Sequence, residues 1–459
     1  MHTRKEAGAH AESPRVPAGH LLAFALPGLG VGTLFFLLSM FLLPFASEVL
    51  GTGTALLSGF ILLARLWDGI SDPLAGHYSD RTRSRLGRRR PWMLAAIVPI
   101  AFASWMLWVP PPALGGRALE LWLGAWVIAF YTATTLFYVP YQSLGAELSP
   151  DPHETTRVFS GMVAGQVSGT LVAAVLGTWV MEQAAVPRDA AGRMTLGLAA
   201  FTAVAIGFAV WRLREHASYE RAHGAKRLFS AFRDVWRNPH ARVVYLATGI
   251  DNLGTASLAT LAFFYAKYIL DAAEQTPLFL VFNVVPGLAV IPLVHRMAAR
   301  FGKVPVWRVA LCVQSLGFVG LSLLQPGQMA LAFLAVATVS LGGTSGQVLA
   351  PSVMSDVVDS DELTSGERKE GAFYALRNLT FKLAFGLGAV AVGLMLEWTG
   401  FVPGAPLGRG TEFGMRTLMG GTPALGALVA VFVLGHYRLG PREHARVLAQ
   451  LAQRARDAD

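Results

Sequence analysis

The segment from Arg65 to Trp92 reads RLWDGISDPLAGHYSDRTRSRLGRRRPW and joins the end of an apolar run to six arginines. Arg65, Asp68 and Asp72 are spaced three and four residues apart, so they share one face of the helix that residues 54–75 are expected to form. A carboxylate at membrane depth is costly and normally faces a protein interior or a watery cavity. This segment therefore predicts an ion or substrate pathway inside a membrane protein.

The composition is that of an integral membrane protein. Of the 459 residues, 53% are hydrophobic and 15% are charged, whereas about 25% of the residues of a soluble domain are charged. Apolar runs of about 20 residues, each long enough to cross about 30 Å of hydrocarbon as a helix, recur along the whole chain. The N-terminal stretch before the first run is polar and lacks the apolar core of a signal peptide. The single cysteine, Cys312, allows no intramolecular disulfide.

The apolar runs predict an all-α fold of twelve transmembrane helices. We expect them at about 20–45, 53–76, 92–110, 119–146, 158–182, 194–212, 242–269, 276–297, 306–324, 328–351, 372–396 and 418–437. An even number of spans places both ends of the chain on one side of the membrane. Basic residues cluster after spans two, six, eight and twelve. Because basic loops stay in the cytoplasm, we expect both ends to be cytoplasmic and the protein to lie in a bacterial inner membrane.

A long charged segment divides the predicted spans into two sets of six. We expect a disordered cytoplasmic N-terminus at 1–19, a six-helix bundle at 20–213, a cytoplasmic linker at 214–241, a second bundle at 242–437 and a cytoplasmic tail at 438–459. A weak repeat supports this division, since GRRRPW at 87–92 is echoed by GKVPVW at 302–307. Two related bundles around a midplane site are typical of secondary transporters.

Four segments resemble one known family. DRTRSRLGRRR at 80–90 is similar to the second-loop signature of the major facilitator superfamily. WDGISDPLAG at 67–76 resembles the glycoside-pentoside-hexuronide:cation symporters, the group that contains melibiose permease, and YVPYQSLGAEL at 138–148 and DVVDSDELTSGERKEGAFY at 356–374 agree. The resemblance implies a major facilitator fold of two pseudo-symmetric bundles. It also implies cation-coupled symport of a sugar- or glycoside-type solute by alternating access.

The resemblance further implies a cation site. Asp68 and Asp72 match the two aspartates of the family's sodium site, and Ser71 takes the place of an asparagine ligand. Thr135 matches the threonine of that site, and Lys382 matches a lysine near the cation. The ion machinery of the family is therefore mostly present in this sequence.

The positions that hold the sugar in melibiose permease differ here. Its first-helix aspartate falls at about Gly32, its fourth-helix aspartate at Tyr138, the following tryptophan at Gln142 and its fifth-helix arginine near Val163. A galactoside specificity is therefore not transferred to this chain.

The chemistry of the paired aspartates supports a cation site but leaves alternatives open. A small hard cation needs several oxygen ligands, which two carboxylates one helical turn apart and nearby hydroxyls supply. A buried carboxylate can instead bind a proton, so Na⁺ leads and H⁺ is the alternative coupling ion. A third interpretation is a structural ionic lock of the aspartates with Arg65 and Lys382. The readings can coexist if Lys382 neutralises the aspartates when no cation is bound.

Asp251 is a candidate for binding the substrate, or for a second coupling carboxylate, because it lies inside the otherwise apolar seventh span. The alternatives are an ion pair with Arg377 and a position at a helix end. Other polar residues of the spans are expected to offer hydrogen bonds to a solute, although ordinary interhelical bonding explains each equally well. These are Tyr138, Gln142, Gln166, Asn252, Gln347, Arg377 and Asn378.

The arginines of the second loop predict a cytoplasmic gate that pairs with acids on neighbouring loops, with simple positive-inside anchoring as the alternative. The partners would be Glu147, Asp151 or Glu154 in the first half, and Asp356, Asp359, Asp361 and Glu362 in the second. The full set of gate candidates is Asp80, Arg81, Arg88, Arg89, Glu147, Asp151, Arg157, Asp356 and Asp359.

Three functions remain open from the sequence. The first is a cation-coupled sugar or glycoside symporter that works as a monomer, with a small solute, a monovalent cation and the lipid bilayer as its partners. A lysophospholipid carrier is the second, because the family's sugar-binding residues are lost, and a non-transporting sensor or scaffold is the third. An enzyme is disfavoured because no catalytic spacing of His, Cys or Ser is present. We expect no cofactor, no transition metal and no nucleic acid partner.

Overall fold

A computed structural model of the chain describes residues 15–149, 152–213, 215, 236–366 and 370–458. These residues form helices and contain no strand. In chain order the helices are α1 (Ala18–Pro44), η1 (Phe45–Val49), α2 (Ala55–Arg81), α3 (Arg90–Trp108), α4 (Gly116–Glu147), α5 (Pro152–Thr178), η2 (Trp179–Gln183), α6 (Pro187–Arg212), α8 (Pro239–Tyr268), η4 (Ala273–Gln275), α9 (Thr276–Phe301), α10 (Lys303–Leu323), α11 (Met329–Ser365), α12 (Glu370–Trp398), α13 (Arg409–Arg416), η5 (Thr417–Gly421), α14 (Thr422–Leu434) and α15 (Pro441–Ala458).

The structure is all-helical, and ten helical segments of its described part are long and apolar enough to cross a membrane. The predicted all-α membrane fold is therefore confirmed. Helices α2 and α8 are also long, at 27 and 30 residues, but they are not among the ten. Each carries charged residues in its middle, such as Asp68 in α2 and Asp251 in α8. That these two helices cross the membrane as well, to give twelve spans, stays a prediction.

Several helices continue beyond the apolar runs that predicted them. The tenth predicted span ends at 351, but α11 continues to Ser365, so Asp356 and Asp359 lie on a helix rather than in a loop. The chain after 438 likewise forms the helix α15, which contacts α11. Hydropathy marks only the part of a helix that lipid covers, whereas backbone hydrogen bonding extends the helix into water.

Helix contacts fall into two groups. In the first, α1 packs against α5 and α6, and α4 packs against α2 and α3; in the second, α10 packs against α11 and α14, and α8 packs against α12 and α14. Small residues permit these close approaches. A Cβ atom on Gly165 of α5 would lie 2.3 Å from the carbonyl oxygen of Ala25, and one on Gly342 of α11 would lie 2.4 Å from that of Ala310.

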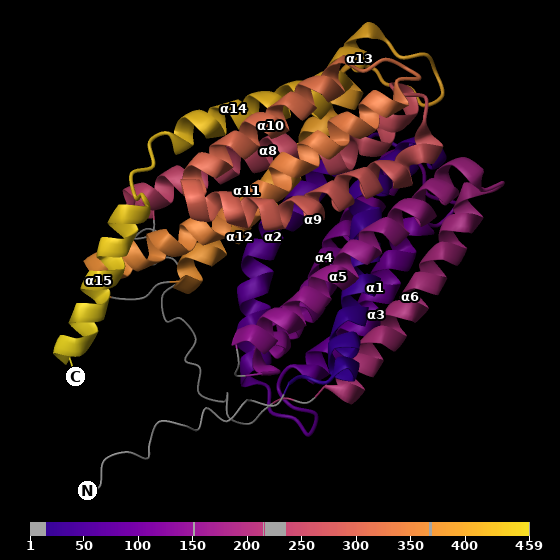
Figure 1. Cartoon of the computed structure of the whole chain (residues 1–459). Helices are drawn as coiled ribbons and strands as arrows, with labels where there is room; N and C mark the ends of the chain where they lie inside the picture. The colour runs from indigo at the N-terminus through magenta and orange to yellow at the C-terminus, as the bar shows by residue number, and fades with distance from the viewer. Residues whose placement is uncertain (1–14, 150–151, 214, 216–235, 367–369, 459) are drawn as a thin grey trace, which may run out of the picture.

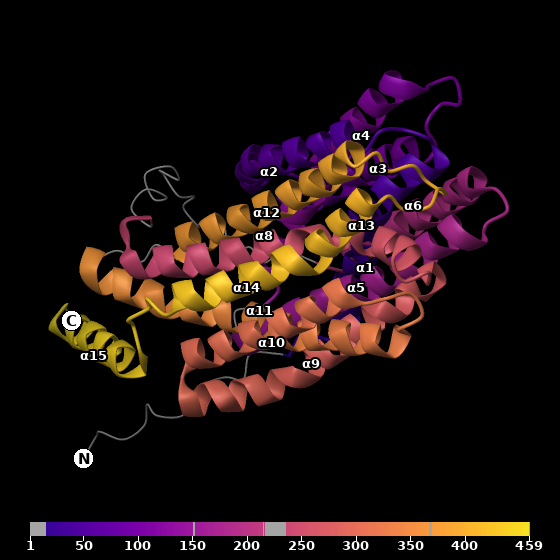
Figure 2. The same cartoon turned by 90° about the horizontal axis from the view of Figure 1, so that it is seen from above.

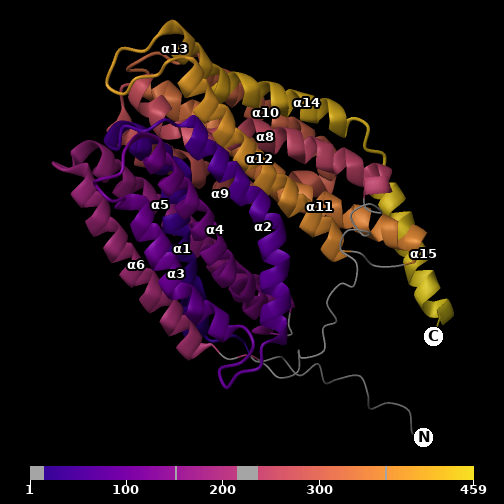
Figure 3. The same ribbon diagram turned by 180° about the vertical axis from the view of Figure 1, so that it is seen from behind.

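The two groups meet mainly where α2 packs against α12, with smaller contacts of α1 with α8 and of α5 with α9. Figure 2 shows α2 and α12 side by side. At the end of the molecule opposite α15, the Thr54 hydroxyl donates a hydrogen bond to the Gly393 carbonyl over 3.0 Å. Toward the α15 end, the ribbons of α2 and of α11 and α12 separate (Figures 1 and 3). The groups are thus joined at one end and spread apart at the other.

The weak sequence repeat has a structural counterpart. Gly87 and Gly302 both have a positive φ, of 106° and 90°, a conformation that glycine adopts without steric cost. Gly87 lies shortly before α3, and Gly302 lies immediately before α10. The two groups therefore share one kind of tight turn at the same point in their helix order.

Candidate functional site

Helices from both groups bring four predicted residues together, which we call the carboxylate cluster: Asp68, Asp72, Thr135 and Lys382. The Lys382 ammonium on α12 donates to Asp72 Oδ2 over 2.5 Å and lies 3.2 Å from Asp68 Oδ2. The Thr135 hydroxyl on α4 donates to Asp72 Oδ1 over 3.0 Å. Three helices thus converge on the charged face of α2.

Arg65 holds the other side of this cluster. Its Nη1 lies 3.5 Å from Asp68 Oδ2, and its guanidinium lies 4.8 Å from the ring centroid of Phe35 and 4.3 Å from that of Tyr131. Contacts of this kind attract a cation to the aromatic face. They restrain the Arg65 side chain against α1 and α4, so the guanidinium stays next to Asp68.

Two oxygens of α2 are buried and make no hydrogen bond to the described residues, namely Asp68 Oδ1 of the cluster and Oγ of Ser71, which is outside it. Asp68 is only 2% exposed. A buried oxygen without a donor costs free energy unless a ligand satisfies it. Together with the oxygens of Asp72 and Thr135, these atoms form the kind of all-oxygen set that a small hard cation prefers. The same carboxylates can thus bind either the Lys382 ammonium or a small cation.

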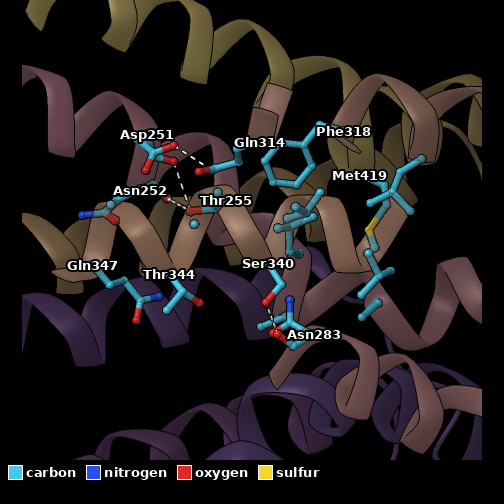
Figure 4. Close-up of a pocket in the computed structure, with 18 of the residues that line it drawn as sticks. Asp251, Asn252, Thr255, Asn283, Gln314, Phe318, Ser340, Thr344, Gln347 and Met419 are labelled. Carbon is cyan, nitrogen blue, oxygen red and sulfur yellow. Dashed lines mark hydrogen bonds between the residues drawn. The ribbon is translucent and has the colours of Figure 1, made fainter. Parts of the chain in front are cut away.

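A second polar site is a cavity of about 370 Å³ lined mainly by helices of the second group. Its polar end holds Asp251, Asn252, Thr344 and Gln347, while Phe318 and Met419 lie toward its other end (Figure 4). The Gln314 amide donates to Asp251 Oδ1 over 2.9 Å. From the first group, Phe36 and Met40 of α1 complete the wall. The cavity therefore combines a polar end around Asp251 with a region of large apolar side chains, to which Ser340 and Asn283 add polar groups, and it is lined from both helix groups.

The predicted substrate residues are divided between this cavity and other places. Asp251, Asn252, Gln347 and Arg377 line it. Tyr138, Gln142, Gln166 and Asn378 do not; Gln142 and Asn378 are exposed, and Tyr138 packs edge-on against Tyr141. Gln314, Thr255 and Thr344 also line the cavity, but they were not predicted, because their hydropathy and spacing are those of ordinary helix residues.

Gln166 lies where α1 and α5 come close together. A Cβ atom on Gly32 would lie 3.2 Å from Gln166 Cα, which is a tight contact. Gly32 is the position at which the resemblance places a sugar-binding aspartate, and a side chain there would require α1 or α5 to shift by a few tenths of an ångström.

The predicted gate residues of the first half form a compact network at the α15 end. Arg88 Nη2 lies 3.0 Å from Glu147 Oε1, and Arg89 Nη2 lies 2.9 Å both from that oxygen and from Asp80 Oδ1. Glu215 accepts hydrogen bonds from the backbone N–H groups of Arg88, Arg89 and Arg90, over 2.8, 2.9 and 3.2 Å. It thereby caps the start of α3.

The remaining first-half candidates lie around this network. Arg157 pairs with Glu154 over 3.3 Å, Arg81 is exposed, and Asp151 lies outside the described residues.

The second group repeats this arrangement. Lys303, which follows the turn at Gly302, lies 2.6 Å from Asp356 Oδ1, and His444 of α15 lies 3.1 Å from Asp359 Oδ2. These ion pairs join segments within one group. Each network connects the helix ends of its own group at the α15 end, where the two groups separate.

Besides the carboxylate cluster, a second set of charges bridges the groups at the end opposite α15, and it was not predicted from the sequence. Lys267, at the end of α8, lies 2.7 Å from Glu48 Oε2 of η1 and 2.8 Å from Glu182 Oε1 of η2. The Tyr268 hydroxyl donates to Glu48 over 3.0 Å. We call these four residues the Lys267 cluster. Each of them lies at the edge of an apolar run. Charged and aromatic residues are common there in any membrane protein, so the sequence did not mark these residues as a gate.

Comparison with known proteins supports this view of the chain. The family model described as MFS/sugar transport protein matches residues 23–440. The chain belongs to that family. Within curated relatives, the chain is 26% identical to an uncharacterised symporter of Synechocystis sp., over 84% of this chain and 87% of the relative. It is 25% identical to the isoprimeverose transporter of Lactiplantibacillus pentosus, over 84% of this chain and 81% of that transporter.

Solved structures agree on the fold. A bacterial homologue of the human lysosomal transporter Spinster, in an inward-facing and unoccupied conformation, superimposes with a TM-score of 0.66 at 15% identity, over 92% of this chain and 98% of the other. The family and the fold together establish a multi-pass membrane transporter of the major facilitator type, and they exclude an enzyme. The predicted family membership is confirmed.

Proposed function

We propose that this family member is a cation-coupled symporter of a sugar- or glycoside-type solute in a bacterial inner membrane, with both ends of the chain in the cytoplasm. The carboxylate cluster is the observation that carries the proposal. It places two aspartates, a threonine hydroxyl and a lysine within 3.2 Å contacts on helices of both groups. Intramembrane carboxylates usually mark ion pathways.

In the proposed mechanism, Lys382 and the cation compete for the same carboxylates. Without a cation, the ammonium of Lys382 neutralises Asp72 and Asp68 and ties α12 to α2. A bound cation replaces that ammonium, and the released lysine changes how the two groups meet. Cation binding is thereby linked to the movement that alternating access requires.

Sodium is the coupling ion that the site geometry favours. A proton occupies one oxygen, whereas Na⁺ takes several. Asp68 Oδ1 and Ser71 Oγ are both buried without a hydrogen-bond partner among the described residues, and Asp72 adds further oxygens close by. These two oxygens without a donor, together with the Asp72 oxygens that accept from Thr135 and Lys382, suit a metal cation better than a single proton.

The conformation fits one step of such a cycle. The Lys267 cluster and the Thr54 contact join the two groups at the end opposite α15, and the groups separate at the α15 end (Figure 1). With the ends of the chain in the cytoplasm, this is an inward-open state, and the Lys267 cluster is the closed outer gate.

The cavity supports a sugar-type solute over a lysophospholipid. Its volume of about 370 Å³ is at the low end of the range for small-molecule sites, roughly 300–1,000 Å³, and it is small for a molecule with a long acyl chain. Amides and hydroxyls at its polar end match the hydroxyl groups of a sugar. A relative named as an isoprimeverose transporter is in keeping with this choice.

The proposal is tested by uptake into proteoliposomes. Purified protein is given radiolabelled glycosides, free sugars and lysophosphatidylcholine under an imposed Na⁺ gradient, an imposed proton gradient, or neither. We expect a glycoside or sugar to accumulate only with the Na⁺ gradient. Accumulation of the lysolipid alone, or uptake that ignores both gradients, would contradict the proposal.

A further inference from the structure

Asp251 brings a negative charge into the cavity of the second group with little compensation. Among the described residues, Gln314 is the one side chain that hydrogen bonds to it, over 2.9 Å. Within the part of the chain that the structure describes, Asp251 takes part in no ion pair, in contrast to Asp72 and Asp356, which each contact a lysine within 2.6 Å. A carboxylate inside a membrane protein needs partners, so this one is available to a ligand.

Gln314 strengthens the demand for hydrogen-bond donors. A carboxylate only accepts hydrogen bonds, so the amide must turn its nitrogen toward Asp251. Its oxygen, Oε1, is then left buried without a donor among the described residues, in a side chain that is 1% exposed. An unpaired buried acceptor costs about 1–3 kcal/mol. Asp251 lines the cavity and can accept further hydrogen bonds, which the hydroxyl groups of a ligand would donate.

The charges of the cavity favour a neutral ligand. Asp251 and Arg377 both line it, so these two opposite charges together add no net charge to the cavity. A neutral ligand matches such a site without bringing a further charge out of water. Its hydroxyl groups can accept from Asn252 and Gln347 while they donate to Asp251.

The cavity also has a large apolar surface. Phe318 of α10 lies beside Gln314 and Met419 of η5 lies farther from Asp251, with Ser340 and Asn283 on the facing side (Figure 4), and Phe36 and Met40 of α1 line the same space. A free sugar would leave these apolar side chains in contact with water. An apolar substituent on the sugar would bury them, at about 25 cal/mol for each Å².

We propose that Asp251, held in position by Gln314, binds adjacent hydroxyls of a neutral glycoside, whose apolar aglycone lies against Phe318 and Met419. This inference rests on the proposed sugar-type function and names its substrate class. It also places recognition on α8 of the second group, with α10 positioning the carboxylate.

Binding rather than transport tests the inference, so its failure is separable from failure of ion coupling. Protein in lipid nanodiscs, free of glycoside detergent, is titrated calorimetrically with methyl and 4-nitrophenyl glycosides of glucose, galactose and xylose. 4-Nitrophenyl glucuronide and lysophosphatidylcholine are the charged and lipidic comparisons. The variants are Asp251→Asn, Gln314→Leu and Phe318→Ala. Asp271→Asn and Gln325→Leu are the matched controls, since both residues are exposed and outside the cavity.

We expect a neutral 4-nitrophenyl glycoside to bind tightest. Asp251→Asn and Gln314→Leu should weaken the methyl and the nitrophenyl compound alike, by about tenfold or more, since a hydrogen bond to a charged group contributes about 1.5–3 kcal/mol. Phe318→Ala should weaken only the nitrophenyl compound. Both controls should bind as the wild type does. Asp251→Asn is nearly isosteric, and it remains informative if Gln314→Leu fails to fold.

Unchanged affinity in the Asp251 and Gln314 variants would overturn the inference, as would tighter binding of the glucuronide or the lysolipid, or no binding of any neutral glycoside. If binding depends on Asp251 but uptake ignores ion gradients, the inference stands and the coupling proposal fails. If uptake is Na⁺-driven but the variants bind normally, the coupling proposal stands and the inference fails.

Discussion

Replacing Lys382 by methionine should make the transporter bind its cation more tightly. The lysine ammonium contacts Asp72 over 2.5 Å and Asp68 over 3.2 Å, so a cation must displace it. At an effective dielectric constant of about 20, charges at these separations attract by roughly 5–7 kcal/mol before desolvation is counted. The side chains of Lys382 and Asp72 are 27% and 35% exposed, and desolvation offsets much of this attraction.

Mutational values give the net magnitude. Hydrogen bonds to charged groups contribute about 1.5–3 kcal/mol, and partial exposure of the Lys382 pair points to the lower half of that range. Removal of a competitor worth about 2 kcal/mol tightens cation binding by about 30-fold. The cation-free variant should in turn be less stable, because two carboxylates are left with Arg65 as their nearby cation.

The assay is a Na⁺ titration of purified protein, read out by calorimetry and by the thermal unfolding midpoint. Lys303→Met is a matched control, because Lys303 pairs with Asp356 over 2.6 Å at a site far along the chain from the carboxylate cluster. It should leave Na⁺ affinity unchanged. The reasoning is refuted if Lys382→Met leaves Na⁺ affinity unchanged or weakens it, since the lysine would then not compete with the ion.

Three further predictions concern single contacts. Thr135→Val removes the 3.0 Å hydrogen bond to Asp72 and should weaken Na⁺ binding about fivefold, whereas Thr135→Ser should not; calorimetry checks both. Lys267→Met should open the outer gate. The reporter is Thr52→Cys, at a buried position, in a Cys312→Ser background. This cysteine should react about tenfold faster with an impermeant maleimide when Lys267 is replaced, and an unchanged rate counts against a gate. Gly32→Ala should cost about 1–2 kcal/mol of stability in thermal unfolding, because its Cβ would crowd Gln166, whereas Gly59→Ala meets nothing within 4 Å and should be tolerated.

The fold could be predicted because a membrane-spanning helix leaves a simple hydropathy pattern in the sequence. A helix that crosses hydrocarbon must be apolar for about 20 residues, and ten described helices satisfy this. The helices α2 and α8 do not, although α8 has 30 residues. They carry Asp68, Asp72 and Asp251, so the least typical helices in composition are those that hold the candidate sites.

The site could be predicted only in part, because spacing gives neighbours along one helix and not across helices. The common face of Asp68 and Asp72 follows from helical periodicity. The contact of Lys382 with Asp72, across 310 residues, was expected from a family resemblance alone. No comparable signal linked Gln314 to Asp251 or Lys267 to Glu48, whose contacts span 63 and 219 residues. The roles of all these residues stay predictions.

Solute-dependent movement of the ion tests the central claim most directly. Proteoliposomes containing the wild type or Asp72→Asn are given ²²Na⁺ outside, with and without a saturating glycoside identified by the binding titrations. Coupled symport predicts that the glycoside accelerates ²²Na⁺ entry into wild-type vesicles and has no effect in the Asp72→Asn vesicles. Glycoside uptake without any added ²²Na⁺ entry, or equal stimulation in both, would contradict an ion site at Asp68 and Asp72.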